Sequence, residues 1–163
     1  MIRPARQEDA QGIARVHVRG WQAAYASVFP TEALAQLSVE QQASTWREGI
    51  VAGQTILVAE EDGVVEGFAA VGSAQDEDAE GLGELYAIYV EPELWGRGLG
   101  RRLIRAAEDA LRTSGFPEAV LWVLEENPRA RHFYEGSGWR ADTSRRIEVL
   151  GADVPEVRYR KSL

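Results

Sequence analysis

Apolar residues recur along this chain at two different spacings, and the changes of spacing mark the expected elements. A spacing of three to four predicts helices from Asp9 to Val28, Thr31 to Val51, Leu99 to Leu111 and Asn127 to Gly138. Short apolar or alternating runs predict strands at residues 2–5, 54–61, 64–74, 84–90 and 119–124, and two more between residues 139 and 163. The pattern contains no repeat or linker, so it predicts a single α/β domain over residues 1–163, with a mixed sheet and helices on both faces.

Turn and capping residues support these boundaries. Asp9 is placed to cap the first helix, and Asp62-Gly63 predicts a hairpin between two strands. Gly115 and then Pro117 end the third helix. The strands at 84–90 and 119–124 are apolar without alternation, which is typical of central strands covered on both faces. The helix between them predicts a parallel, right-handed crossover.

Charge and composition exclude several classes of function. Lys and Arg total 18 and Asp and Glu total 26 in 163 residues, so the net charge is −8. That balance argues against a nucleic-acid or membrane-surface binder and is compatible with cationic small molecules. Cys is absent and His17 and His132 are the only histidines, so we expect no disulfide, no metal centre and no cysteine acyl-enzyme. No run has transmembrane length and residues 1–5 do not resemble a signal peptide, so we expect a cytoplasmic protein.

A glycine-rich loop joins the central strand to the third helix. Gly96, Gly98 and Gly100 let the main chain approach a ligand closely, and the helix N-terminus adds partial positive charge, so the loop suits a diphosphate. Arg101-Arg102 stands where a P-loop has Lys-Ser/Thr, and the glycine spacing does not fit the dinucleotide-binding fingerprint. The simpler alternative is a tight turn before a solvated basic helix face, made by Arg97, Arg101, Arg102 and Arg105.

Two blocks resemble the GCN5-related N-acetyltransferase (GNAT) family. The family's acetyl-CoA loop reads Q/R-x-x-G-x-G/A, and residues 95–100, Trp-Gly-Arg-Gly-Leu-Gly, are similar to it except at Trp95. The second block, residues 127–139, resembles the family pattern Asn-x-x-Ala-x-x-Phe-Tyr-(x)₃-Gly-Phe, with Trp139 in place of the last Phe. The order of predicted strands and helices also matches the family fold. The resemblance therefore extends over the whole chain.

The resemblance implies a mostly antiparallel sheet whose central parallel strands splay apart to admit the pantetheine arm of acetyl-CoA. It implies that Asn127 contacts the cofactor and that Tyr134 faces its sulfur. It also makes a homodimer plausible. The main chain would hold the pantetheine arm at Ile88, Tyr89 and Val90, and the diphosphate at Gly96, Arg97, Gly98, Leu99, Gly100 and Arg101.

Acetylation of an amine by a thioester requires a proton acceptor, an oxyanion donor and an acid for the leaving thiolate. Without Cys we expect direct attack in a ternary complex. Tyr134 is the candidate acid because a phenol is protonated at neutral pH, although it could simply pack on the sheet. Glu84 at the start of the central strand is the candidate base, or an ordinary strand-end carboxylate. Some family members carry a base five residues before the Asn; here that residue is Trp122.

Aromatic residues of the first helix are candidates for the acceptor pocket. Trp21, Tyr25 and Phe29 offer rings that hold an ammonium by cation–π contact, although Trp21 also fits the core stripe. We expect a small cationic amine or a polyamine as acceptor. The alternatives are a protein or peptide N-terminus, a lysine side chain, a catalytically silent CoA-binding module, and a nicotinamide-binding protein. The acidic run from Asp76 to Glu80 is interpreted as a solvated loop.

Overall fold

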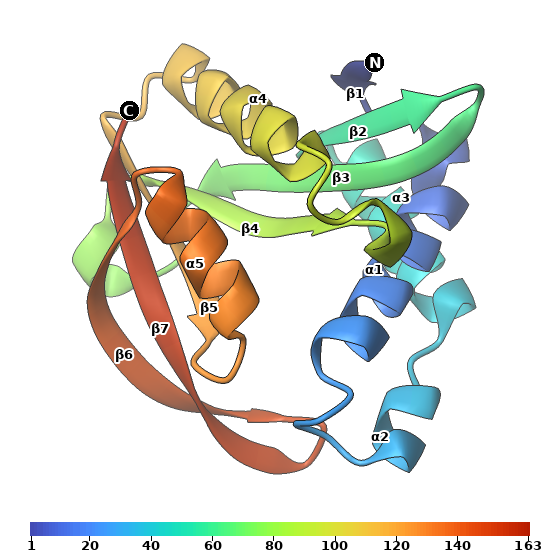
Figure 1. Ribbon diagram of the computed structural model, residues 1–163. Coiled ribbons are helices and arrows are strands. Elements are labelled where there is room, and N and C mark those ends of the chain that lie inside the picture. Colours follow the sequence, from blue (N-terminus) through green and yellow to red (C-terminus); the bar gives the residue numbers. More distant parts are fainter.

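The computed structural model describes residues 1–163 and contains one seven-stranded sheet with strand order β1-β2-β3-β4-β5-β7-β6 (Figure 1). Every neighbouring pair is antiparallel except β4 and β5. The expected fold class, a mostly antiparallel sheet with a central parallel pair, is confirmed. The strands are β1 (Ile2–Pro4), β2 (Thr55–Glu61), β3 (Val64–Ser73), β4 (Gly83–Val90), β5 (Glu118–Leu124), β6 (Arg140–Val149) and β7 (Ala152–Ser162).

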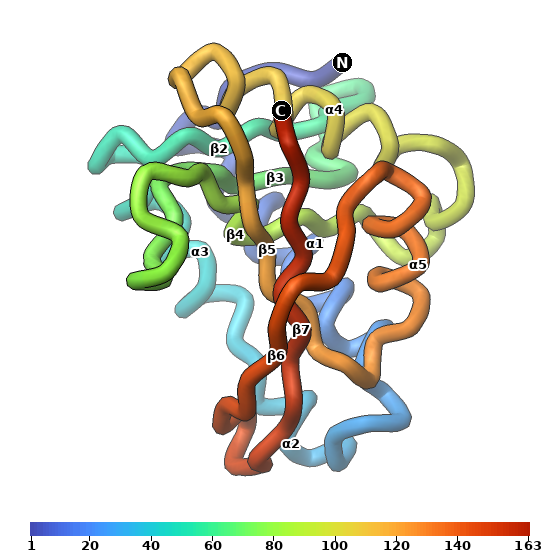
Figure 2. Tube along the Cα trace, turned by 90° about the vertical axis from the view of Figure 1, so that its left-hand side faces the viewer, coloured from blue at the N-terminus to red at the C-terminus, as the bar shows by residue number.

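Helices cover both faces of the sheet because its strands are apolar on both faces. Ala69 of β3 packs toward α4 and α5, whereas its neighbours Phe68 and Ala70 pack toward α1 and α3. Figure 2 shows α5 on one side of the strands and α3 on the other. The helices are α1 (Ala10–Ala24), α2 (Thr31–Ala35), α3 (Val39–Val51), α4 (Leu99–Thr113) and α5 (Pro128–Gly136), with 3-10 turns η1 (Gln7–Asp9), η2 (Glu77–Ala79) and η3 (Pro92–Leu94).

The parallel strands β4 and β5 pair only at their beginnings. Gly83 lies opposite Ala119 and Glu84 opposite Val120, and beyond these residues the two strands separate. Tyr86 adds to the irregularity, because Ala87 pairs with Ala70 while Leu85 pairs with Val71, which leaves Tyr86 as a bulge. The edge of β4 that faces β5 therefore keeps unpaired main-chain groups along its second half.

The Asp62-Gly63 hairpin is confirmed. Both residues have positive φ angles, 49° and 80°, as a two-residue type I′ turn requires. None of the helices combines the length and hydropathy of a membrane span.

Three predicted helix boundaries were wrong. The predicted helix from Thr31 to Val51 is two helices, because Ser38 adopts an extended conformation and accepts the Gln41 N–H at 3.1 Å as the N-cap of α3. Asp9 does not cap α1: its backbone is already helical, and its carboxylate accepts the Arg6 N–H at the start of η1. The first helix also ends at Ala24, so it does not reach Val28.

Candidate active site

A cleft of about 730 Å³ opens where β4 and β5 separate. On the side of α4 and α5 it is lined by the glycine loop and by residues along the length of α5. On the opposite side it is lined by α1 and by the hairpin of β6 and β7. The cleft therefore passes through the sheet and offers two separate approaches to the gap between the strands. We refer to it as the central cleft.

The glycine loop forms the rim of the central cleft at the start of α4. Gly98 is the residue before the helix and has a φ of 87°, a conformation that favours glycine, and no side chain caps the helix there. The first N–H groups of α4 are therefore free to bind an anion. Gly96, Gly98, Gly100 and Arg101 line the cleft, whereas the side chain of Leu99 is buried in the core and Arg97 is exposed away from the lining.

Three residues of β4 expected to hold the cofactor, Ile88, Tyr89 and Val90, all line the central cleft. The Tyr89 hydroxyl accepts a hydrogen bond from Trp21 Nε1 at 2.7 Å. Burial raises the pKa of Tyr89, so this phenol stays protonated across the physiological range. Its own proton is thus free to be donated into the cleft.

Trp95, the residue that departs from the family loop, has two contacts. Its Nε1 donates to the Val90 carbonyl at 3.0 Å, which fixes the ring at the end of β4. The guanidinium carbon of Arg129, at the start of α5, lies 3.4 Å from the ring centroid. Arg129 forms no ion pair with a carboxylate and lines the cleft beside the glycine loop. The cation–π contact thus places an unpaired positive charge at the mouth of the cleft.

Asn127 and Tyr134, both from the second family block, line the cleft from the side of α5. The Asn127 side chain caps α5 by accepting the Ala130 N–H at 3.1 Å and also donates to the Tyr25 hydroxyl at 3.1 Å. Tyr134 is 8% exposed, and burial raises the pKa of its phenol. The structure thus leaves Tyr134 as a protonated donor inside the cleft.

The three aromatic residues expected in the acceptor pocket do not share one environment. Trp21 and Tyr25 line the central cleft with their ring centroids 4.5 Å apart. Phe29 is 4% exposed and packs behind Tyr25 without reaching the cleft. It supports the wall and is not part of it.

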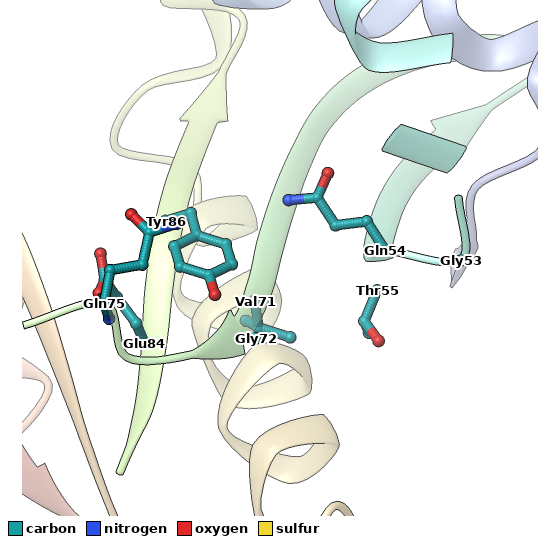
Figure 3. Close-up of a pocket in the computed structure, with 8 residues that line it drawn as sticks. All are labelled: Gly53, Gln54, Thr55, Val71, Gly72, Gln75, Glu84 and Tyr86. Atoms are coloured by element: carbon teal, nitrogen blue, oxygen red, sulfur yellow. Dashed lines mark hydrogen bonds between the residues drawn. The ribbon is translucent and has the colours of Figure 1, made fainter. Parts of the chain in front are cut away.

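Glu84 lies outside the residues that line the central cleft. It borders a second, more open pocket of about 630 Å³, where its carboxylate accepts the Gln75 N–H at 3.2 Å. Figure 3 shows Glu84, Gln75 and Tyr86 together on one side of this pocket and Gln54 and Thr55 on the other. Burial is the main cause of the raised pKa of Glu84. Tyr86 lines both pockets, and Leu85, the chain neighbour of Glu84, lines the central cleft.

A charged network beside the cleft is absent from the sequence-based prediction. Arg145 bonds Asp76 and Glu156, and its guanidinium lies 3.8 Å from the Trp122 ring centroid. Arg158, only 4% exposed, bonds Asp76, Asp78 and Asp142. We call these six ionic residues the β7 network.

The interpretation of residues 76–80 as a solvated loop was wrong for Asp76, whose side chain is 13% exposed and accepts from Trp122 Nε1 at 2.9 Å. The alternation of charge along β7 offered a signal. Glu156 and Arg158 share one face of that strand, whereas Val157 and Tyr159 pack in the core on the other. When two neighbouring positions on one face of a strand are charged and the other face is buried in the core, the charged face indicates a polar site.

Comparisons with known proteins agree with the fold and with the two sequence blocks. Residues 18–139 match the model of the acetyltransferase (GNAT) family. The chain is 32% identical over 156 residues to the uncharacterized N-acetyltransferase YuaI of Bacillus subtilis (strain 168), covering 96% of this chain and 89% of that protein. It is 27% identical over 159 residues to the L-amino acid N-acyltransferase MnaT of Escherichia coli (strain K12), covering 96% and 83%. The crystal structure of PaiA N-acetyltransferase from Thermoplasma acidophilum in complex with coenzyme A superposes with a TM-score of 0.80 at 22% identity, covering 100% and 98% of the chains. The chain belongs to the acetyltransferase (GNAT) family, as the two sequence blocks indicated.

Proposed function

We propose that this protein transfers the acetyl group of acetyl-CoA to a primary amine. The observation that carries the proposal is the free N-terminus of α4 at the rim of a cleft that continues between β4 and β5. Such an opening offers unpaired N–H groups to a diphosphate at one end and unpaired strand edges to a linear arm beyond it. The coenzyme A bound by the structurally similar PaiA protein supports the same assignment.

In the proposed complex the main chain of Ile88, Tyr89 and Val90 holds the pantetheine arm. The loop from Gly96 to Arg101 holds the diphosphate, and Asn127 contacts the arm from the side of α5. One N–H of β4 donates to the thioester carbonyl oxygen and stabilises the oxyanion that forms there. Loss of one such donor typically costs about 3 kcal/mol of transition-state stabilisation.

The acceptor enters from the side of α1. Its ammonium first loses a proton, which we assign through water to Glu84, whose pKa is raised by burial. The neutral amine nitrogen then attacks the thioester carbon, and the C–S bond breaks as the tetrahedral intermediate collapses. Tyr134 donates its phenolic proton to the departing thiolate, and the second proton lost by the nitrogen restores the phenol. The products are the N-acetyl amine and free CoA, with no covalent enzyme intermediate.

Small cationic amines, polyamines included, are the proposed acceptors ahead of protein N-termini and lysine side chains. The net charge of −8 and the β7 network both favour an arriving cation. An L-amino acid is a second candidate, since the relative MnaT is named for that class of acceptor. The cytoplasmic location and the homodimer are proposals that rest on the sequence alone.

Two measurements on the purified protein test the function. Calorimetry with CoA should give saturable binding, and acetyl-CoA mixed with an amine panel should release free thiol. Binding without thiol release would instead indicate a silent CoA-binding module. Binding of NADH but not of CoA would overturn the assignment.

A further inference from the structure

We propose that the acceptor is a primary monoamine with an apolar body, and that Glu156 is the residue that receives its ammonium group on binding, before that nitrogen loses its proton and attacks. This inference rests on the proposed function and narrows its acceptor class. It starts from one feature of the central cleft: among its thirty lining residues, Glu156 is the only carboxylate.

Glu156 has one oxygen free. The residue is 6% exposed, and Arg145 Nε donates to Oε1 at 2.5 Å, while Oε2 accepts no hydrogen bond from the protein. Glu156 and Tyr25 both line the central cleft. A carboxylate oxygen without a protein donor, on a mostly buried side chain of a cleft that is also lined by aromatic rings, is a suitable partner for an ammonium group.

The charge around Glu156 also favours a cation. In the β7 network the two guanidinium groups of Arg145 and Arg158 face four carboxylates, so a negative excess remains beside the cleft. Arg145 therefore does not neutralise the site. This field attracts every cationic amine, whatever the number of its ammonium groups.

The lining of the central cleft around Glu156 distinguishes amines with one ammonium group from amines with two. Around Glu156 the lining residues of the acceptor side are Trp21, Ala24, Trp122, Leu124, Ile147 and Val149, and none of them is charged. Figure 1 shows the tip of the β6–β7 hairpin, which carries Val149, next to α2, and their apolar residues form one cluster. A second ammonium group on the acceptor would lie against this wall without a carboxylate, which is unfavourable. An apolar body of the acceptor would instead pack against these uncharged residues.

Two substrates of equal length test the proposal on the wild-type enzyme. Hexylamine and 1,6-diaminohexane share the reacting amine and the six-carbon chain and differ only in the distal ammonium group. We expect kcat/KM for hexylamine to exceed that for the diamine by about tenfold or more. A diamine, spermidine, a lysyl peptide or L-methionine that matches or exceeds hexylamine would overturn the proposal.

The role of Glu156 is tested by Glu156→Gln, with Glu148→Gln on the exposed face of β6 as the matched control. We expect Glu156→Gln to raise KM for hexylamine by about tenfold with an unchanged Kd for CoA, and Glu148→Gln to change neither. An unchanged KM in Glu156→Gln would overturn the assignment.

Hexylamine binding to the CoA-loaded protein, measured by calorimetry, separates this proposal from the function. If hexylamine binds through Glu156 but no amine releases thiol, acceptor recognition stands and the transfer activity fails. If hexylamine neither binds nor reacts, the acceptor class is wrong. If the protein does not bind CoA, the proposed function itself is wrong.

Discussion

Asn127 Nδ2 donates a hydrogen bond to the Tyr25 hydroxyl at 3.1 Å and so joins residues 102 positions apart in the sequence. Oδ1 of the same amide accepts the Ala130 N–H at 3.1 Å as the N-cap of α5. One side chain therefore starts the helix that carries Tyr134 and ties it to the C-terminal end of α1. This amide holds together the two sides of the central cleft.

Variants of Asn127 separate its two bonds. Asn127→Ala should lower the free energy of unfolding by about 1 kcal/mol or more, because α5 loses its cap. Asn127→Ser keeps a capping oxygen and should recover most of that loss, although it lacks the donor to Tyr25. Tyr25→Phe removes the bridging bond alone. Urea unfolding of the three variants measures each contribution; equal stability of Asn127→Ala and the wild type would contradict this assignment.

Tyr134→Phe should lower kcat by about a hundredfold, the lower range for loss of a general acid, with little change in the Kd for CoA. The Tyr134 hydroxyl has no hydrogen-bond partner in the protein, so its removal leaves the fold almost unchanged. Tyr159→Phe is the matched control, since that buried hydroxyl accepts from Arg131 and does not line the cleft. Stopped-flow detection of thiol release distinguishes the two variants. Equal rates of thiol release in Tyr134→Phe and the wild type would exclude Tyr134 as the acid.

Glu84→Gln should abolish the rise of kcat with pH that an ionising base produces. A general base acts when deprotonated, so the rate increases as pH rises through the pKa of Glu84, which burial holds above the usual carboxyl value. We expect the wild-type profile to show this ascending limb and Glu84→Gln to have a low, flat rate over the same interval. Glu80→Gln, on an exposed residue of the preceding loop, should retain the wild-type profile. A limb that persists in Glu84→Gln would assign the base to another group.

The sequence predicted the sheet and the glycine loop because both follow from local patterns. Strands without alternating polar and apolar residues identified β4 and β5 as central. Glycines before a helix identified the free N-terminus of α4. Asn127 and Tyr134 were identified because both belong to the second family block, residues 127–139, which is continuous in the sequence. Each of these signals lies within about a dozen neighbouring residues.

The β7 network could not be predicted because its members come from three separate segments. Asp76 and Asp78 precede β4, Asp142 and Arg145 lie on β6, and Glu156 and Arg158 lie on β7. Their contact depends on strand order and register, which bring Arg145 opposite Glu156. The position of Glu84 in the second pocket depends likewise on where β4 and β5 separate, a tertiary feature that local spacing does not encode.

Arg129→Met should weaken binding of CoA about tenfold, equivalent to about 1.4 kcal/mol, and leave pantetheine binding unchanged. The reason is that the guanidinium stacked on Trp95 meets the diphosphate, which pantetheine lacks. Trp95→Leu should have a smaller effect in the same direction, because the charge remains but is no longer held. Arg112→Met, at the far end of α4, controls for net charge. Calorimetry gives each Kd; an equal loss of pantetheine affinity would show that Arg129 acts on the arm or the fold instead.

His17 should make the protein less stable as pH falls from 7 to 5. Burial against Tyr89 and Trp46 lowers the pKa of His17 to about 4, below its ordinary value of about 6.5. As pH falls, the unfolded chain therefore binds a proton at His17 before the folded protein does. The contribution of His17 to the free energy of unfolding is fully present above about pH 6.5 and is lost as pH falls toward 4. At pH 5 the loss amounts to about 2 kcal/mol.

His17→Gln should remove this component, since Gln does not titrate and still offers an acceptor to Trp46 Nε1, which bonds His17 Nδ1 at 3.3 Å. Its free energy of unfolding should fall less between pH 7 and 5 than that of the wild type, whatever its absolute stability. His132→Gln, on an exposed residue of α5, is the matched control for the loss of a histidine and should keep the wild-type slope. Urea titrations at the two pH values measure the slopes. Parallel slopes for His17→Gln and the wild type would contradict this prediction. They would mean that the folded protein accepts a proton at His17 as readily as the unfolded chain does. The packing of the His17 ring against Tyr89 and Trp46 argues against that outcome.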